Sequence, residues 1–280
     1  MNDLSLISPS FDKQIVNSYT LSVKLRFDGL SFCVFDVVTN TFVALGNTDF
    51  EEPDMNFARQ EEFMACNELF SYNYKRTLVS IDSQAFTMMP SSLFDEQKAR
   101  GVLEFLGAKP APDDRIVGDT VSIADDTIVY YLPQFLYYFL QSQFANLRLM
   151  HCVEPVVEAM LTKRLATDRK NTVNIVVENT RMYILVAEGN RLKLSNFYDT
   201  ADVSDMVYAV MNTLDQLNIN NDDTSVTVSG NIDERSELFR LLSRFAHNVR
   251  MASLPLYFQY GFQVPDEQRF VNLFLMSLCE

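Results

Sequence analysis

Residues 173–197 read VNIVVENTRMYILVAEGNRLKLSNF, and this stretch decides the fold class of the chain. Three strand patterns rich in β-branched and other apolar residues follow one another at Val173–Val177, Met182–Ala187 and Leu192–Phe197. The short polar sequences Glu178-Asn179-Thr180 and Gly189-Asn190 separate them, and Asn and Gly favour tight turns. Strands joined by such short turns predict an antiparallel sheet.

The chain after this sheet alternates between helix and strand patterns. A helix is predicted from apolar residues at helical spacing, namely Val203, Met206, Val207, Val210, Met211, Leu214 and Leu217. A short strand, Thr224–Val228, then ends in Ser229-Gly230-Asn231. A second amphipathic helix carries Leu238, Leu241, Leu242 and Phe245, and Val249–Met251 is the last predicted strand.

The first half of the chain has the same order of elements. Its predicted strands are Leu21–Phe27, Phe32–Asp36 and Phe42–Leu45, followed by a helix over Asn56–Phe70 and a strand over Thr77–Ile81. The turns at Asp28 and Asn40 and the strand end at Asp82 have counterparts about 150 residues later, far beyond the period of a solenoid repeat. The sequence therefore predicts a duplicated unit and two domains.

Extra sequence lies between the two copies. It contains a loop at Lys109–Asp114, a hairpin of Thr120–Ile123 and Thr127–Leu132 turned at Asp125-Asp126, a helix from Pro133 to about Phe144, a strand at Leu147–Met150 and a helix at Val153–Leu165. The polar segment Thr167–Asn171 is the predicted linker. The expected domains are residues 1–166, with the inserted hairpin, and residues 167–280.

Composition excludes several classes of protein. The chain has 280 residues, 48% of them hydrophobic and 21% charged, which is typical of globular proteins. Its net charge of −14 argues against binding nucleic acid or an anionic membrane. The charge-free stretch Thr127–Leu147 contains Pro133 and several amides, so it is interpreted as buried structure and not as a membrane span.

The termini and cysteines favour a cytoplasmic protein. No basic residue precedes Lys13 and no apolar run follows the start, so no signal peptide is expected. The four cysteines, Cys33, Cys66, Cys152 and Cys279, form no CxxC pair and are expected to be free thiols. The two histidines, His151 and His247, are isolated, so no zinc site is predicted.

The doubled order of three antiparallel strands, helix, strand and helix resembles the paired ribonuclease-H-like domains of the actin, Hsp70 and sugar-kinase superfamily. Over about residues 18–280 the chain resembles the actin-like cytoplasmic modules of bacterial pilus and secretion assembly proteins. It resembles most closely a bacterial family of unknown function with an actin-like ATPase fold. The resemblance implies an α/β fold of two duplicated ribonuclease-H-like domains, each a mixed sheet with helices.

The resemblance also implies where a nucleotide would bind. In that superfamily, ATP lies between the domains against glycine-rich turns, and an aspartate beside each turn organises Mg²⁺. Gly29 takes the glycine position of the first turn, but Phe27 stands where the aspartate belongs, and Glu178-Asn179-Thr180 has no glycine. The third signature, a glycine pair, survives only as Ser229-Gly230-Asn231. Gly29, Ser31 and Gly230 are therefore the candidate residues of a vestigial nucleotide cleft.

Two other chemistries are compatible with some of the residues. A two-metal nuclease would use Asp28 or Asp36, Glu61 or Glu62, and Asp82, although each also suits a turn, a solvated helix face or a strand end. A thiol–imidazole pair at His151-Cys152 is not expected, because neighbours on a strand point to opposite faces.

Two segments are candidates for contact with a partner. The acidic loop Asp49–Asp54 is either a solvated lead-in to a helix or a docking site for a basic partner. In the aromatic helix, Tyr137, Tyr138 and Phe139 cover most of the circumference, so at least one ring is expected to face outward and contact a protein.

These observations predict a non-enzymatic cytoplasmic interaction or scaffolding protein with a degenerate actin-like nucleotide cleft. The expected partner is another protein or a second copy of the chain, with no nucleic acid and no membrane span. No cofactor is expected apart from weak binding of ATP with Mg²⁺, and no catalytic or metal-ligating residue is assigned. The alternative is a functional nucleotide-binding ATPase or kinase.

Overall fold

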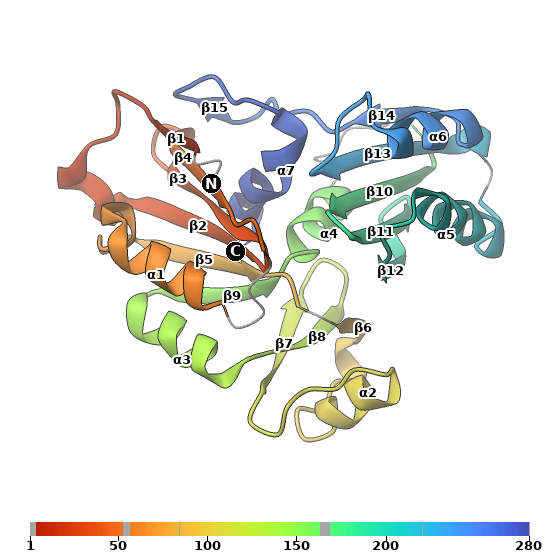
Figure 1. The fold of residues 1–280 in the computed structure, drawn as a ribbon, viewed down its shortest axis with the longest axis horizontal. Coiled ribbons are helices and arrows are strands. Elements are labelled where there is room, and N and C mark those ends of the chain that lie inside the picture. Colours follow the sequence, from red (N-terminus) through yellow and green to blue (C-terminus); the bar gives the residue numbers. More distant parts are fainter. Residues whose placement is uncertain (1–3, 53–56, 84, 163–168, 220, 280) are drawn as a thin grey trace. The chain divides into compact units, whose positions relative to one another are not determined.

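A computed structural model describes residues 4–52, 57–83, 85–162, 169–219 and 221–279. Its internal contacts divide the chain into two units (Figure 1). Unit 1 comprises Met1–Glu154, Leu256–Val264 and Cys279–Glu280, and unit 2 comprises Pro155–Pro255 and Pro265–Leu278. The predicted change of domain between residues 166 and 167, and the start of the predicted linker, lie outside the described residues.

Unit 1 is built on a mixed sheet in the strand order β1-β4-β3-β2-β5-β9 (Figure 1). The strands are β1 (Leu4–Ile7), β2 (Tyr19–Arg26), β3 (Gly29–Asp36), β4 (Thr41–Asp49), β5 (Arg76–Ile81) and β9 (Leu147–His151), and the two-residue β15 (Gln259–Tyr260) pairs with β4. Strands β2, β3 and β4 are antiparallel neighbours, whereas β5 runs parallel to both β2 and β9. β2 and β3 are buried along their whole length, so they form the centre of this unit.

A second, three-stranded sheet belongs to the same unit. It consists of β6 (Phe86–Pro90), β8 (Asp126–Leu132) and β7 (Arg115–Val121), in that order, and α2 (Ala99–Phe105) packs against it. The helix α3 (Gln134–Gln143) leads from β8 to β9. β7 is the last strand of this sheet, and β9 is the last strand of the main sheet of unit 1.

Unit 2 repeats the topology of the main sheet of unit 1. Its order is β12-β11-β10-β13-β14, with β10 (Asn171–Glu178), β11 (Arg181–Glu188), β12 (Arg191–Asp199), β13 (Thr224–Gly230) and β14 (Val249–Met251). Again three antiparallel strands come first, and two parallel strands follow. The prediction of a duplicated ribonuclease-H-like unit is confirmed by this shared order.

The helices of unit 2 cover its sheet through one apolar face each. In α5 (Val203–Gln216), Ser204 N–H and Asp205 N–H donate to the Asp202 side chain, which caps the start of the helix. Phe239 N–H donates to Ser236 Oγ in the same way at the start of α6 (Glu237–Phe245). Apolar residues of both helices pack with those of β10, β11 and β13 in one core, and α7 (Glu267–Leu275) lies against β13.

Several predicted bounds were wrong. The first helix, α1, covers Ala58–Cys66 and stops short of Phe70, because Asn67 is extended and its side chain accepts a hydrogen bond from Leu69 N–H, which starts a separate 3₁₀ turn at Glu68–Phe70. Strand β7 begins at Arg115, earlier than expected. The helix after β9 is α4 (Glu154–Leu161), and the predicted extension to Leu165 reaches residues that are not described.

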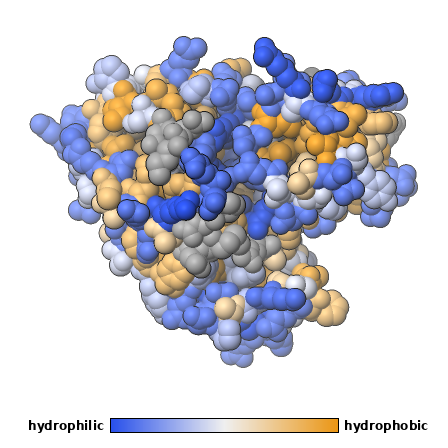
Figure 2. All heavy atoms as spheres, in the orientation of Figure 1, coloured by the Kyte–Doolittle hydropathy of each residue, from blue (hydrophilic) through white to orange (hydrophobic). Residues whose placement is uncertain are grey.

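The stretch Thr127–Leu147 folds as most of β8, the ten-residue α3 and the first residue of β9. Among the described helices, none has the length and apolar character needed to cross a bilayer. In the view of Figure 2, hydrophilic residues cover much of the visible surface and hydrophobic residues gather in patches. Large hydrophobic side chains that are more than half exposed include Val38, Leu93, Phe105, Tyr138, Tyr208 and Leu256.

Candidate nucleotide site

The first candidate turn lies in unit 1, between β2 and β3. Gly29 has φ +153°, and a Cβ atom there would lie 2.1 Å from the Thr48 carbonyl oxygen. This distance is far below van der Waals contact, so any side chain at position 29 would push β4 away from β3. The glycine is thus required by the close approach of two strands of the sheet.

The hydroxyl of Ser31 is hydrogen-bonded to residues of the two neighbouring strands, β2 and β4. Arg26 Nη1 donates to Ser31 Oγ at 2.7 Å, and Ser31 Oγ donates to Asn47 Oδ1 at 2.7 Å. The Arg26 side chain is only 6% exposed and also forms ion pairs with Asp28 at 3.1 Å and Asp49 at 2.7 Å. A guanidinium, two carboxylates and a hydroxyl therefore satisfy one another beside this turn.

Phe27, at the position of the expected metal-organising aspartate, packs on Phe57 with 5.0 Å between the ring centroids. An aromatic ring has no oxygen to offer to Mg²⁺. Among the described residues, no three His, Cys, Asp or Glu side chains are grouped so that they could hold a metal ion.

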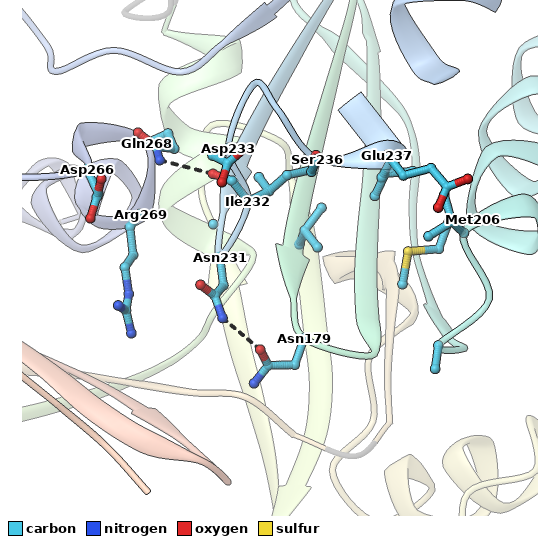
Figure 3. Close-up of a pocket in the computed structure, with 15 residues that line it drawn as sticks. Asn179, Met206, Asn231, Ile232, Asp233, Ser236, Glu237, Asp266, Gln268 and Arg269 are labelled. Atoms are coloured by element: carbon cyan, nitrogen blue, oxygen red, sulfur yellow. Dashed lines mark hydrogen bonds between the residues drawn. The ribbon is translucent and has the colours of Figure 1, made fainter. Parts of the chain in front are cut away.

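The third candidate, Gly230, lines a pocket of about 390 Å³ in unit 2 (Figure 3). The pocket lies where the turn after β10, the start of α5, the loop from β13 to α6 and the start of α7 meet. Because β10 and β13 are parallel neighbours, their carboxyl ends reach the same edge of the sheet, which is where open α/β sheets bind ligands.

The backbone of the β13–α6 loop is hydrogen-bonded to the chain itself. Gly230 has φ +99°, and a Cβ there would lie 2.1 Å from the Val177 carbonyl oxygen. Asn231 N–H donates to that same oxygen at 2.7 Å, and Ile232 N–H donates to Gly230 O at 2.9 Å. Two N–H groups that follow the glycine therefore point at protein carbonyls.

Side chains tie the loop to its neighbours as well. Asn231 Nδ2 donates to Asn179 Oδ1 at 2.7 Å, which joins the loop to the turn after β10 (Figure 3). Gln268 Nε2, from α7, donates to Ile232 O at 3.0 Å (Figure 3). The bridge between Asn179 and Asn231 was not predicted, because two exposed asparagines far apart in the sequence carry no signal of their contact.

Charges around the pocket are predominantly negative. Asp233, Glu237 and Asp266 contribute carboxylates to its lining, and Arg269 contributes one guanidinium. A bound triphosphate would bring three or four negative charges close to these carboxylates. Because like charges repel most strongly where water is partly excluded, this lining disfavours a triphosphate.

The residues considered for a nuclease do not converge. Asp28 pairs with Arg26, whereas Asp36, at the other end of β3, accepts hydrogen bonds from Val38 N–H and Thr39 Oγ1. Glu61 and Glu62 lie on α1, and Glu62 is exposed. Asp82 follows β5 and is buried, and the described part of the chain holds no group of three acidic side chains, histidines or cysteines that could bind a metal ion.

His151 and Cys152 are in contact, so the prediction that they point to opposite faces was wrong. His151 is the last residue of β9, so Cys152 lies beyond the strand and the alternation of faces does not apply. Cys152 Sγ lies 3.9 Å from His151 Nδ1. That nitrogen also accepts a hydrogen bond from Val153 N–H at 3.4 Å, and the imidazole is fully buried, so the contact positions a core histidine.

The aromatic helix has the predicted outward-facing rings. Tyr138 is 57% exposed, and Tyr137 and Phe139 are half-buried. The Tyr137 ring lies 5.3 Å from the Arg115 guanidinium, and its hydroxyl accepts a hydrogen bond from Gln141 Nε2 at 2.8 Å. Their role as an interface stays a prediction.

Tyr137 also lines a second pocket, of about 490 Å³, in unit 1. The other lining residues are Val117, Gln141, Phe144, Ala145, Leu147 and Leu149. They come from β7, α3 and β9, so the pocket is flanked by two strands that each end a sheet. We call this pocket the β7–β9 groove.

The acidic loop is only partly described. Asp49 is held by Arg26, and Asn47 Nδ2 donates to its other oxygen at 3.1 Å, so this residue stabilises the hairpin. Pro53 and Asp54 lie outside the described residues.

Comparison with solved structures identifies the class of protein. The crystal structure of a Bacteroides thetaiotaomicron protein with an actin-like ATPase fold and unknown function is 20% identical, with a TM-score of 0.76 over 96% of this chain and 99% of that one. The PilM–PilN type IV pilus biogenesis complex contains a chain that is 10% identical, with a TM-score of 0.62 over 92% of this chain and 97% of that one. Together with the repeated strand order, these similarities show that the protein has the two-domain, ribonuclease-H-like fold of the actin-like ATPases.

Residues 8–249 match the family described as "Protein of unknown function (DUF3822)". The chain therefore belongs to this family. A search of curated proteins finds no match.

Proposed function

We propose that the protein is a non-enzymatic interaction or scaffolding module of the bacterial cytoplasm, in which the nucleotide cleft of the actin-like fold is degenerate. One observation carries the proposal that the nucleotide cleft is degenerate. At the edge of the unit 2 sheet, the loop that follows Gly230 donates its Asn231 N–H and its Asn231 side-chain amide to oxygens of the chain itself.

A phosphate needs N–H donors that point outward from a turn, together with positive charge or a metal ion. Here the donors next to Gly230 are engaged, carboxylates outnumber the guanidinium, and Phe27 replaces a metal-organising aspartate. Gly29 and Gly230 both have structural reasons to be glycine. The fit of these residues to ATP with Mg²⁺ is therefore poor.

We expect Mg-ATP at millimolar concentration to leave the thermal unfolding temperature of the protein unchanged, with Mg²⁺ alone and a salt of equal ionic strength as controls. A nucleotide at a hundred times its dissociation constant would stabilise the protein by about 2.7 kcal/mol, which a thermal-shift titration detects easily. Asn231→Gly restores the glycine pair and removes the bridge to Asn179. If Mg-ATP stabilised only this variant, Asn231 would be the residue that prevents nucleotide binding. If Mg-ATP stabilised the wild type and phosphate were released, the ATPase or kinase alternative would be supported.

A protein partner is supported by the similarity to PilM, whose structure was determined in a complex with PilN. The proposed contact surface in this chain is the β7–β9 groove together with Tyr138. Five of its seven lining residues are apolar and a sixth is Tyr137, and Tyr137, Tyr138 and Phe139 are partly or largely exposed. Tyrosine combines a large apolar ring with a polar tip, which suits a protein interface.

We expect Tyr138→Ala to weaken binding of the cognate partner, or self-association, at least tenfold, as truncation of an aromatic anchor does. The partner would be identified by pull-down with the wild type, and the affinity of the purified pair measured by calorimetry. Sedimentation would report self-association. Tyr208→Ala is the matched control, because Tyr208 is 70% exposed on α5 in unit 2. Equal affinity for the wild type and both variants would contradict this location of the interface.

A further inference from the structure

A cluster of buried ionisable side chains lies in unit 1, and none of its three members lines either pocket. Arg148 Nη2 on β9 lies 2.5 Å from Glu154 Oε1 at the start of α4, and 3.7 Å from Asp119 Oδ1 on β7. The Glu154 and Asp119 side chains are only 3% and 7% exposed, and that of Arg148 is 23% exposed. One guanidinium thus faces two buried carboxyl groups.

Among the described residues, the other groups that act on this cluster are a tyrosine, a histidine and two thiols. Tyr130 on β8 is fully buried, and burial together with Asp119 and Glu154 raises the pKa of its hydroxyl, which stays neutral. The backbone N–H of His151 donates to Asp119 Oδ2, and the His151 ring accepts a hydrogen bond at Nδ1 from Val153 N–H. The thiols of Cys152 and Cys279 are further titratable neighbours, of Tyr130 and Arg148 respectively.

With both carboxyl groups ionised, the buried cluster would carry one uncompensated negative charge. Such a charge is costly in a medium of low dielectric constant, so one proton is retained. Burial, and next the neighbouring Asp119, raise the pKa of Glu154 to about 9, although Arg148 opposes the shift. Among the described residues, Glu154 Oε2 has no hydrogen-bond partner, so no donor stabilises a charge on that oxygen.

The position of Glu154 gives this proton a structural consequence. Glu154 is the first residue of α4, and the chain passes from unit 1 to unit 2 directly after it. We propose that Asp119, Arg148 and Glu154 form a pH-sensitive switch that holds the first turn of α4 while Glu154 keeps its proton, and releases that turn when the proton is lost.

The direction of the pH effect follows from the number of protons bound by the closed and the open form of α4. When α4 opens, Glu154 meets water and its pKa returns toward the ordinary value near 4.5. Between this value and about 9, the closed form binds one proton more than the open form. The opening equilibrium therefore rises with pH across this window, by up to about tenfold per pH unit, and levels off above it.

Hydrogen exchange tests the switch. We expect the protection of the α4 amides, corrected for the intrinsic exchange rate, to fall as the pH is raised from about 6 to 8, by up to about tenfold per unit. Glu154→Gln removes the titration, so its α4 protection should not vary with pH and should exceed that of the wild type at the upper end. Glu267→Gln is the matched control, because Glu267 also begins a helix but is exposed, and this variant should keep the wild-type slope.

A second measurement on the wild type holds even if Glu154→Gln fails to fold. Carbon-13 NMR of the side-chain carboxyl should show Glu154 titrating far above its ordinary range, and Asp119→Asn should lower its pKa by removing the competing carboxylate. Titration of wild-type Glu154 near its ordinary value would overturn the proposal. So would a Glu154→Gln protein whose α4 protection keeps the wild-type pH slope.

Discussion

Replacing Gly230 with alanine is expected to lower the free energy of unfolding by about 2–5 kcal/mol. The new Cβ would lie 2.1 Å from the Val177 carbonyl oxygen, in a backbone conformation of φ +99° that L-residues rarely adopt. Relief would require β13 to separate from β10, at the point where their ladder ends at Val177 and Gly230. Denaturant unfolding followed by circular dichroism measures the loss.

Two other glycines provide matched controls for this substitution. Gly189 also has a positive φ, +60°, but a Cβ there would meet nothing within 4 Å, so Gly189→Ala should cost only about 1–2 kcal/mol. Gly101, inside α2, also has open space and no unusual φ, so Gly101→Ala should stabilise by about 0.5–1 kcal/mol. Equal losses for Gly230→Ala and Gly189→Ala would contradict the close approach to Val177.

This result limits how the nucleotide cleft can be tested. Gly29 has the same relation to the Thr48 carbonyl oxygen as Gly230 has to that of Val177. A bulky residue at either position would disturb the sheet before it could report on phosphate binding. Asn231→Gly is the better probe, because it changes the loop without adding atoms.

Arg26→Met is expected to destabilise the protein by about 2–4 kcal/mol, because it removes the guanidinium from a buried network and leaves the two carboxylates without its positive charge. Arg26 donates to Ser31 Oγ and pairs with Asp28 and Asp49, whose side chains are 24% and 28% exposed. Water can reach these carboxylates in part, which moderates the loss. The change in unfolding free energy would again be read from denaturant curves.

Arg115→Met serves as the exposed counterpart of that substitution. Arg115 is 51% exposed, and its nearest ion-pair partner, Glu96, lies 4.0 Å away. Such surface pairs contribute about 0–1 kcal/mol, so only a small change is expected. If Arg26→Met were as mild as Arg115→Met, the network beside Gly29 would not contribute to stability.

Local sequence patterns predicted most elements, because the antiparallel strands of this fold pair with strands that are next to them in the sequence. The predicted turn residues Asn40, Asn179 and Gly189 all adopt positive φ, as short polar residues and glycine can. By contrast, β1, α2 and α7 were not predicted. The buried residues of α7 form one run, Phe270–Leu275, and such a short run does not distinguish a helix from a buried strand. β1 has only four residues, which alternate between half-buried and exposed.

The candidate site was predicted less completely, because glycine motifs do not reveal why glycine is present. A phosphate and a neighbouring carbonyl oxygen both require a residue without a side chain, and only the packing of β4 against β3, and of β10 against β13, distinguishes them. The cluster of Asp119, Arg148 and Glu154 was not predicted at all. Its members lie on β7, β9 and α4, and each alone looks like an ordinary surface charge.

What the sequence determined by itself is the duplicated order of strands, turns and helices, and with it the fold class. These features depend on residues close together in the chain, where side-chain alternation and turn preferences act directly. Only the tertiary structure decided which atoms meet: Asn231 with Asn179 and Val177, Arg26 with Asp49, and Glu154 with Arg148. The physical reason is that burial and hydrogen-bond distances depend on elements that are far apart in the chain and meet only in the fold. The same neighbours decide whether a charged side chain is paired and whether a position requires glycine.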